Sequence, residues 1–145
     1  MAFKVLCVDH VGVAVNDLAL IKKQMKDLLN LEPSLPDETV EEQHVTTSFF
    51  KPSAQSEACE LEFLGSTTPD YLIARYIAKN GGKNGFQHVA LRVDNIVEAL
   101  AALPEDAKLD KHWRVGAGGC HIAFMHPKAT GLLLELTERP GDSSF

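Results

Sequence analysis

The chain has 145 residues, of which 45% are apolar and 23% charged, and its net charge is -6. This composition can bury a core, which excludes a wholly disordered chain, and the acidic balance lacks the basic face that binds nucleic acid. No stretch reaches membrane-spanning length, and Asp9 and His10 interrupt the N-terminus before an apolar signal region is complete. We therefore expect one cytoplasmic domain over residues 1–145, with no nucleic acid and no membrane as partner.

The three cysteines are Cys7, Cys59 and Cys120, and each sits among apolar neighbours. Their odd number and wide spacing do not fit a disulfide framework, and they favour a reducing compartment. We expect buried thiols that serve in packing.

An internal repeat organises the sequence. The residues from Asp9 to Leu18 resemble those from Gln87 to Ile96, and each segment is typical of a strand that leads into a helix. Further on, Leu61 to Leu64 resembles Leu134 to Thr137. Each half therefore opens with a strand that carries histidine and closes with a strand that carries glutamate.

The first half predicts a helix and then strands. Asn16 and Asp17 are favourable N-cap residues, and apolar residues follow them at spacings of three and four. These apolar residues are Leu18, Ile21, Met25 and Leu28. Runs rich in β-formers near 45–50 and 59–64 predict strands.

A short helix connects the halves, beginning at Thr68-Pro69-Asp70 and ending at Gly81-Gly82. Its inward residues are predicted to be Ile73, Tyr76 and Ile77.

The second half repeats the pattern of the first. Asp94 and Asn95 cap a predicted helix that carries Ile96, Leu100 and Leu103. Strands are predicted over 119–125 and 131–137, and the polar end from Gly141 is expected to fray.

The two repeated histidines share their strand faces with small residues. Side chains alternate across a strand, so His88 shares a face with Ala90, while His10 shares one with Gly12 and Ala14. Small residues beside a histidine leave room, which predicts a cavity wall. The opposite, apolar faces are expected to pack on helices.

Glu62 and Glu135 each project opposite apolar neighbours, so two histidines and two glutamates converge if the halves pair. Buried carboxylates repel one another and need a cation or protons. One divalent ion bound by His10, Glu62, His88 and Glu135 satisfies all four, and this ligand set suits Co, Zn, Ni or Mn. Taken singly, each of these residues is more often an ordinary polar side chain, but the repeated order favours the metal site.

Several motifs carry a family resemblance. They are Asp9–Val15, Glu41–Gln43, Gly85–Ala90, Gly116–Gly119, His126–Lys128 and Leu134–Leu136. Together they resemble the vicinal oxygen chelate superfamily, which includes glyoxalases and bleomycin resistance proteins, and within it the methylmalonyl-CoA epimerases.

The resemblance implies an α+β fold in which two βαβββ modules pair into a cupped, incomplete barrel. The modules would span 4–66 and 84–138, joined by a helical linker over 67–83. It also implies a homodimer, and metal ligands at the same four residues that the repeat indicates.

The resemblance further implies a metal-dependent epimerase of an acyl-CoA thioester, with methylmalonyl-CoA as the favoured substrate. Glu135 would take the α-proton, and Lys128 would lie near the CoA. Thr47 occupies a substrate-facing position where some epimerases have a glutamate, which leaves the second acid/base group open. His44, Glu42 and Glu60 are further candidates for that role, although each also fits an ordinary surface position.

Two other functions stay open at this point. The same ligands suit a lactoylglutathione lyase of the glyoxalase I type, although no clear basic cluster for glutathione is present. A small-molecule binding protein of the same superfamily is the alternative without catalysis, and the retained ligand set argues against it.

Overall fold

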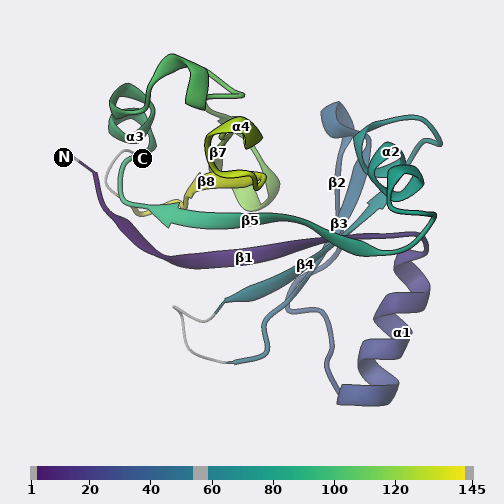
Figure 1. Cartoon of the computed structure of the whole chain (residues 1–145). Helices are drawn as coiled ribbons and strands as arrows, with labels where there is room; N and C mark the ends of the chain where they lie inside the picture. The colour runs from purple at the N-terminus through teal and green to yellow at the C-terminus, as the bar shows by residue number, and fades with distance from the viewer. Residues whose placement is uncertain (1–2, 54–58, 143–145) are drawn as a thin grey trace. The chain divides into compact units, whose positions relative to one another are not determined.

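The computed structural model describes residues 3–53 and 59–142. Along the chain, β1, α1 and β2 to β4 precede α2, and β5, α3 and β6 to β8 follow it (Figure 1). Two short additions, the 3₁₀ turns and helix α4, lie within loops. This order confirms the α+β class and the repeat of a strand, a helix and three further strands.

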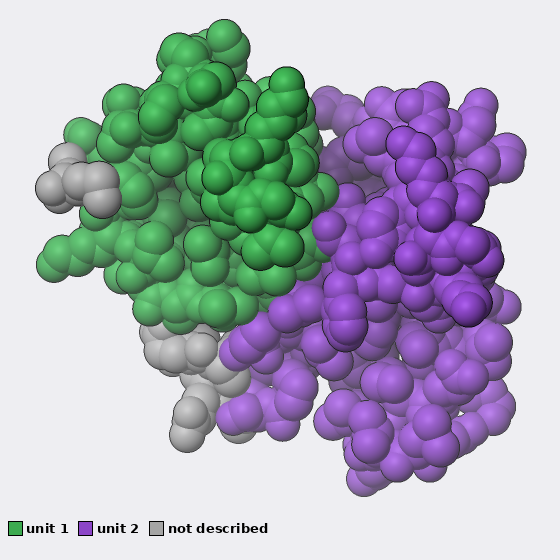
Figure 2. All heavy atoms as spheres, viewed as in Figure 1, with its two compact units in different colours: residues 1–10, 88–145 green, residues 11–87 purple. Residues whose placement is uncertain are grey.

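The chain divides into two compact units (Figure 2). Unit 1 consists of Met1–His10 with His88–Phe145, and unit 2 is Val11–Gln87. Both boundaries fall inside strands, β1 and β5, that carry the repeated histidines.

Unit 2 holds strands in the order β2-β3-β4-β1, in which β3 is antiparallel to both β2 and β4. Thr47 lies opposite Glu38 on one side and opposite Leu64 on the other. The strands of this unit are β1 (Val5–Val15, its second part), β2 (Glu38–Val40), β3 (Val45–Phe50) and β4 (Glu60–Ser66).

Helix α1 (Leu18–Leu29) begins as predicted, because the Asp17 side chain accepts a hydrogen bond from the Leu20 amide at 3.0 Å. Its apolar residues pack on a cluster formed by Val15, Phe50 and Phe63. The helix residues in this contact are Leu18, Ile21 and Met25. Leu28, predicted for the same face, is instead 75% exposed.

Helix α2 (Leu72–Lys79) is the predicted linker helix, and its buried residues are Ile73 and Ile77. They pack with Ala14, Val45 and Leu64. Gly82, at a φ of +76°, ends the helix by donating its amide to the Ile77 carbonyl at 2.9 Å.

The prediction that Ala14 lines a cavity is wrong. Ala14 is fully buried among the residues of α2, β3 and β4, because α2 covers this part of β1.

Unit 1 holds strands in the order β1-β5-β8-β7-β6. β5 and β8 are parallel, whereas β7 is antiparallel to both β8 and β6. The strands are β5 (Gly85–Val93), β6 (Arg114–Val115), β7 (His121–Phe124) and β8 (Leu134–Glu138), with the first part of β1.

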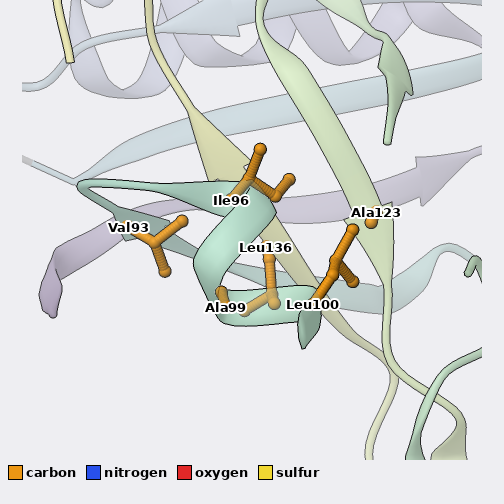
Figure 3. Packing of buried hydrophobic residues seen from close by; sticks show 6 residues of the cluster. All are labelled: Val93, Ile96, Ala99, Leu100, Ala123 and Leu136. Carbon is orange, nitrogen blue, oxygen red and sulfur yellow. The ribbon is translucent and has the colours of Figure 1, made fainter. Parts of the chain in front are cut away.

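Helix α3 (Ile96–Ala102) covers the apolar face of these strands. Asn95 caps it by accepting from the Glu98 amide at 3.0 Å, as the sequence predicts. Figure 3 shows side chains of the helix beside those of β5, β7 and β8. The buried cluster is Val93, Ile96, Ala99, Leu100, Ala123 and Leu136.

The loop that holds Leu109 and Asp110 is tied to β7. Asp110 accepts a hydrogen bond from the Phe124 amide at 2.8 Å, and the Phe124 carbonyl accepts from Leu109 at 3.0 Å. Short 3₁₀ turns form over Glu105–Ala107 and Ala117–Gly119, and α4 spans Pro127–Thr130. Within the described part of the chain, no helix is long and apolar enough to cross a membrane.

Glu138 offers a test of this core. Its carboxylate is fully buried and accepts from the Ile96 amide, at the first turn of α3, at 2.7 Å. We expect Glu138→Ala to lower the free energy of unfolding by about 2–3 kcal/mol, because the buried amide loses its acceptor. Glu138→Gln keeps an acceptor oxygen and should cost less.

Urea unfolding followed by circular dichroism measures this difference, with Glu32→Ala as the matched control. Glu32 is exposed and its ion pair with Lys26 is 3.4 Å long, so its loss should change stability by less than about 0.5 kcal/mol. Equal stability of the Glu138→Ala and Glu32→Ala variants would contradict the role of Glu138.

Candidate metal centre

Three of the predicted ligands, His10 on β1, His88 on β5 and Glu135 on β8, lie together in unit 1. One ligand atom from each lies within 4.8 Å of the other two, and none of the three residues is more than 6% exposed. The parallel register explains part of this arrangement. Ala90 lies opposite Glu135, and strand alternation puts His88 on the same face as Ala90.

The spacing of the three ligand atoms fits a shared ion. The two histidine Nε2 atoms are 3.2 Å apart. Glu135 reaches His10 Nε2 at 3.5 Å through one carboxylate oxygen and His88 Nε2 at 3.7 Å through the other. Ligand atoms about 2.0–2.2 Å from one ion stand roughly 3.0–3.5 Å apart, so small side-chain adjustments close the site around a metal.

Asp9 orients the first histidine. Its carboxylate is 5% exposed and lies 2.7 Å from His10 Nδ1, and Arg139 Nε donates to its second oxygen at 2.6 Å. The pair with Asp9 puts the ring proton on His10 Nδ1 and leaves Nε2 as the ligand atom. Burial alone would raise the pKa of Asp9, but the hydrogen bonds from His10 and Arg139 outweigh it and lower the pKa to about 2.

This role of Asp9 was not predicted from the sequence. The available signal was its position directly before a repeated histidine, where the second copy has the half-buried Gln87. An adjacent residue normally points to the other face of a strand, so alternation gives no reason to pair Asp9 with His10.

His88 is held from the side by aromatic contacts. Its ring meets the His10 ring edge to face, with centroids 5.3 Å apart, and meets Phe124 in the same way at 5.6 Å. The Arg114 guanidinium lies over the Phe124 ring, 5.7 Å from its centroid. It also forms an ion pair with Asp110 at 2.9 Å.

Glu62, the fourth predicted ligand, belongs to unit 2 and is 5% exposed on β4. Its neighbours Leu61 and Phe63 pack in the cluster under α1, so Glu62 points to the other face of the strand, as predicted. Glu60 shares that face and is 8% exposed, so the alternative of an ordinary surface position does not hold for it.

Thr47 and Lys128, the predicted substrate contacts, differ in burial. Thr47 is 2% exposed, and its hydroxyl donates to the Glu38 carbonyl at 3.5 Å. Lys128 is exposed in the first turn of α4, where its amide donates to His126 Nδ1 at 3.1 Å.

Two further candidates for an acid/base role, His44 and Glu42, lie in the turn that precedes β3. His44 ends a 3₁₀ turn (Glu41–Gln43) in the left-handed region, at a φ of +51°, and its ring packs on Tyr71. Glu42 is exposed in the same turn. His121, outside the predicted site, stacks on Trp113 with centroids 3.7 Å apart.

No disulfide joins the three cysteines, as predicted. The expectation that all three are buried is wrong, because Cys59, directly before β4, is exposed and Cys7 is half-buried. Cys120 is half-buried, and burial together with the negative charge of Asp9 raises its thiol pKa to about 11.

Comparison with known proteins shows the family and the fold. A family model described as Glyoxalase/Bleomycin resistance protein/Dioxygenase superfamily matches residues 9–124. The chain is 35% identical to the uncharacterized protein YqjC of Bacillus subtilis, over 92% of this chain and 93% of that one. It is 33% identical to the mitochondrial methylmalonyl-CoA epimerase of Bos taurus, over 90% of this chain and 73% of that one.

A solved structure of a methylmalonyl-CoA epimerase in complex with methylmalonyl-CoA and NH4+ has the same fold. Its TM-score is 0.86 at 28% identity, covering 98% of this chain and 100% of that one. The similarity extends over both halves of the repeat.

Thiol labelling tests the environment of Cys120. At pH 8 we expect iodoacetamide to modify Cys120 at least about tenfold more slowly than the exposed Cys59, because the raised pKa keeps Cys120 protonated. The labelling rate of Cys120 should then rise with pH up to about 11. Timed peptide mass spectrometry gives both rates, and urea-unfolded protein, in which the two cysteines should react alike, is the control. Equal rates in the folded protein would contradict the prediction.

Proposed function

The chain belongs to the Glyoxalase/Bleomycin resistance protein/Dioxygenase superfamily, and we propose that it is a metal-dependent epimerase of an acyl-CoA thioester, with methylmalonyl-CoA as substrate. The buried group of His10, His88 and Glu135 carries the proposal of a metal. The similarity to methylmalonyl-CoA epimerases over most of the chain supports the substrate.

We assign the ion to His10, His88 and Glu135, with Glu62 as the fourth ligand. Two imidazole nitrogens with carboxylate oxygens suit Co, Zn, Ni or Mn, and a bound ion of this kind would supply a Lewis acid for substrate oxygens. Within unit 1, the donor atoms are already turned toward one another, at 3.2 to 3.7 Å.

Glu135 is the proposed base. A carboxylate oxygen of Glu135 accepts the proton from the carbon between the thioester and the substrate carboxylate, and the electron pair of the C–H bond moves onto the thioester oxygen. A bound divalent cation supplies positive charge where this negative charge develops. Return of a proton to the opposite face of the planar carbon inverts the centre.

Inversion requires a second acid/base group on the far side of that carbon. Thr47 does not fit this role, because a hydroxyl that donates to the Glu38 carbonyl is not a base at neutral pH. It fits a contact that shapes the substrate site. Glu42, His44 and Glu60 are the further candidates for this second group. Of these three, Glu60 is the buried residue, and it lies on the same face of β4 as Glu62.

Lys128 is the proposed contact for the CoA portion. Its ammonium is exposed at the start of α4 and can meet a phosphate in solvent. The glycine-rich turn over Ala117–Gly119, with φ of +70° and +74° at its last two residues, lacks the sequence of a phosphate-binding P-loop.

Metal binding tests the ligand assignment. We expect chelator-stripped protein to bind one Co(II) per chain by isothermal titration calorimetry. His88→Ala and Glu62→Ala should each weaken binding by more than the roughly 10–100-fold that loss of an outer-shell partner costs. Glu60→Ala, a change of the same type on the same face of β4, should bind with nearly wild-type affinity. Wild-type affinity of Glu62→Ala would remove Glu62 from the ligand set.

Proton exchange tests the reaction. With saturating Co(II) in deuterium oxide, proton NMR should show loss of the α-proton signal of methylmalonyl-CoA. Glu135→Gln should slow this exchange by at least about 100-fold, because the base is lost, whereas the exposed-site variant Glu32→Gln should not.

Because Glu135 is also a proposed ligand, Co(II) occupancy of the Glu135→Gln variant is measured in the same samples. Metal binding by the wild-type protein without exchange would overturn the epimerase proposal and leave the metal site standing. The lactoylglutathione lyase assay would then be the next measurement.

A further inference from the structure

We propose that the C-terminal turn, residues 139–142, holds His10 in its metal-binding orientation, with Arg139 positioning Asp9 and Asp142 positioning Arg139. The inference rests on the proposed metal site and adds positioning residues to it. All of the contacts that carry it lie within unit 1.

The first step is the pair between His10 and Asp9. A histidine binds a metal through one ring nitrogen, and the hydrogen bond of the other nitrogen decides which one is available. His10 Nδ1 lies 2.7 Å from Asp9 Oδ1, so Nε2 is the nitrogen that faces His88 and Glu135.

The second step fixes the carboxylate itself. Arg139 Nε donates to Asp9 Oδ2 at 2.6 Å, so each oxygen of the buried carboxylate has its own charged or polar partner. Two partners on opposite oxygens set the plane of the carboxylate. With Arg139 absent, the carboxylate could rotate and the direction of its bond to His10 would no longer be held.

The third step is the turn that holds Arg139. Asp142 accepts from the Arg139 amide at 2.8 Å, and its own amide donates to the Arg139 carbonyl at 3.0 Å. Arg92 of β5 donates to both Asp142 oxygens, at 2.8 and 3.1 Å. The turn is therefore tied to the strand that carries His88, and Arg139 is held over Asp9.

This arrangement corrects, at Asp142, the expectation that the polar end frays from Gly141. Asp142 has a side chain only 9% exposed, and both its backbone and its carboxylate are bonded. Residues 143–145 lie outside the described part of the chain.

The network is separate from the apolar core. The core cluster of unit 1 consists of residues of β5, α3, β7 and β8, and Arg139, with 27% of its side chain exposed, is not among them. Loss of the Arg139 side chain should therefore affect metal affinity more than packing.

The test is Co(II) affinity of the stripped full-length protein, measured by calorimetry, together with thermal unfolding of the metal-free forms. Arg139→Gln and Asp9→Asn should each raise the Kd for Co(II) by about 10–100-fold, and Asp142→Asn should raise it by less. Arg139→Lys, which keeps a cationic donor, should recover part of the affinity.

Arg75→Gln is the matched control. Arg75 is an exposed residue of α2 whose Nε donates to the Asp70 carbonyl, so its loss should leave the Kd unchanged. Long-range ¹H–¹⁵N spectra of the Zn(II)-loaded protein provide the second readout. They should show His10 protonated at Nδ1 in the wild type and a perturbed or fast-exchanging Nδ1 proton in Arg139→Gln.

The outcomes separate this inference from the proposed function. If the wild type binds Co(II) and the folded Arg139→Gln variant binds equally well, the inference is overturned and the metal site stands. A lowered melting temperature with unchanged Kd also overturns it, because the turn would then have a structural role alone. If the wild type itself binds no Co(II), the metal proposal fails and the inference fails with it. Should Arg139→Gln not fold, Arg139→Lys and Asp142→Asn decide by the same criteria.

Discussion

A carboxylate and two imidazoles facing one another in a buried site are the constraint on which the rest of unit 1 depends. Glu135, His10 and His88 leave water together, and charge removed from water must be met by other groups. The strands meet this requirement by bringing donors from β1, β5 and β8 to one point. The apolar residues of α3 pack on the other face of the same strands, where they form the core of the unit.

The support around this site is not symmetrical, although it arises from a repeat. Asp9 precedes the first histidine and forms a charged network with Arg139, whereas Gln87 precedes the second. The His88 ring contacts the rings of His10 and Phe124 edge to face. The residue before the histidine thus differs between the two copies, and the charged network that reaches Arg139 belongs to the first copy.

Expectations from the sequence were correct where they depended on neighbouring residues, and wrong where they depended on which faces become buried. The caps at Asp17 and Asn95 depend on neighbouring residues alone, so both helix starts were predictable. Ala14 and Leu28 were misplaced because alternation and helical spacing say which residues share a face, and not what covers that face. Asp142 was misplaced for a similar reason, since its partners Arg92 and Arg139 come from the strands and the turn of the folded unit.

The sequence by itself determined the α+β class, the two similar halves and the identity of the candidate ligands, because these depend on local spacing and on a repeat visible in the residues. Tertiary structure decided the Nε2-to-Nε2 approach of His10 and His88, the pairing of Asp9 with Arg139 and the raised pKa of Cys120. Arg139 is 130 positions from Asp9, and contacts over that separation depend on strand register and burial, which no local pattern encodes.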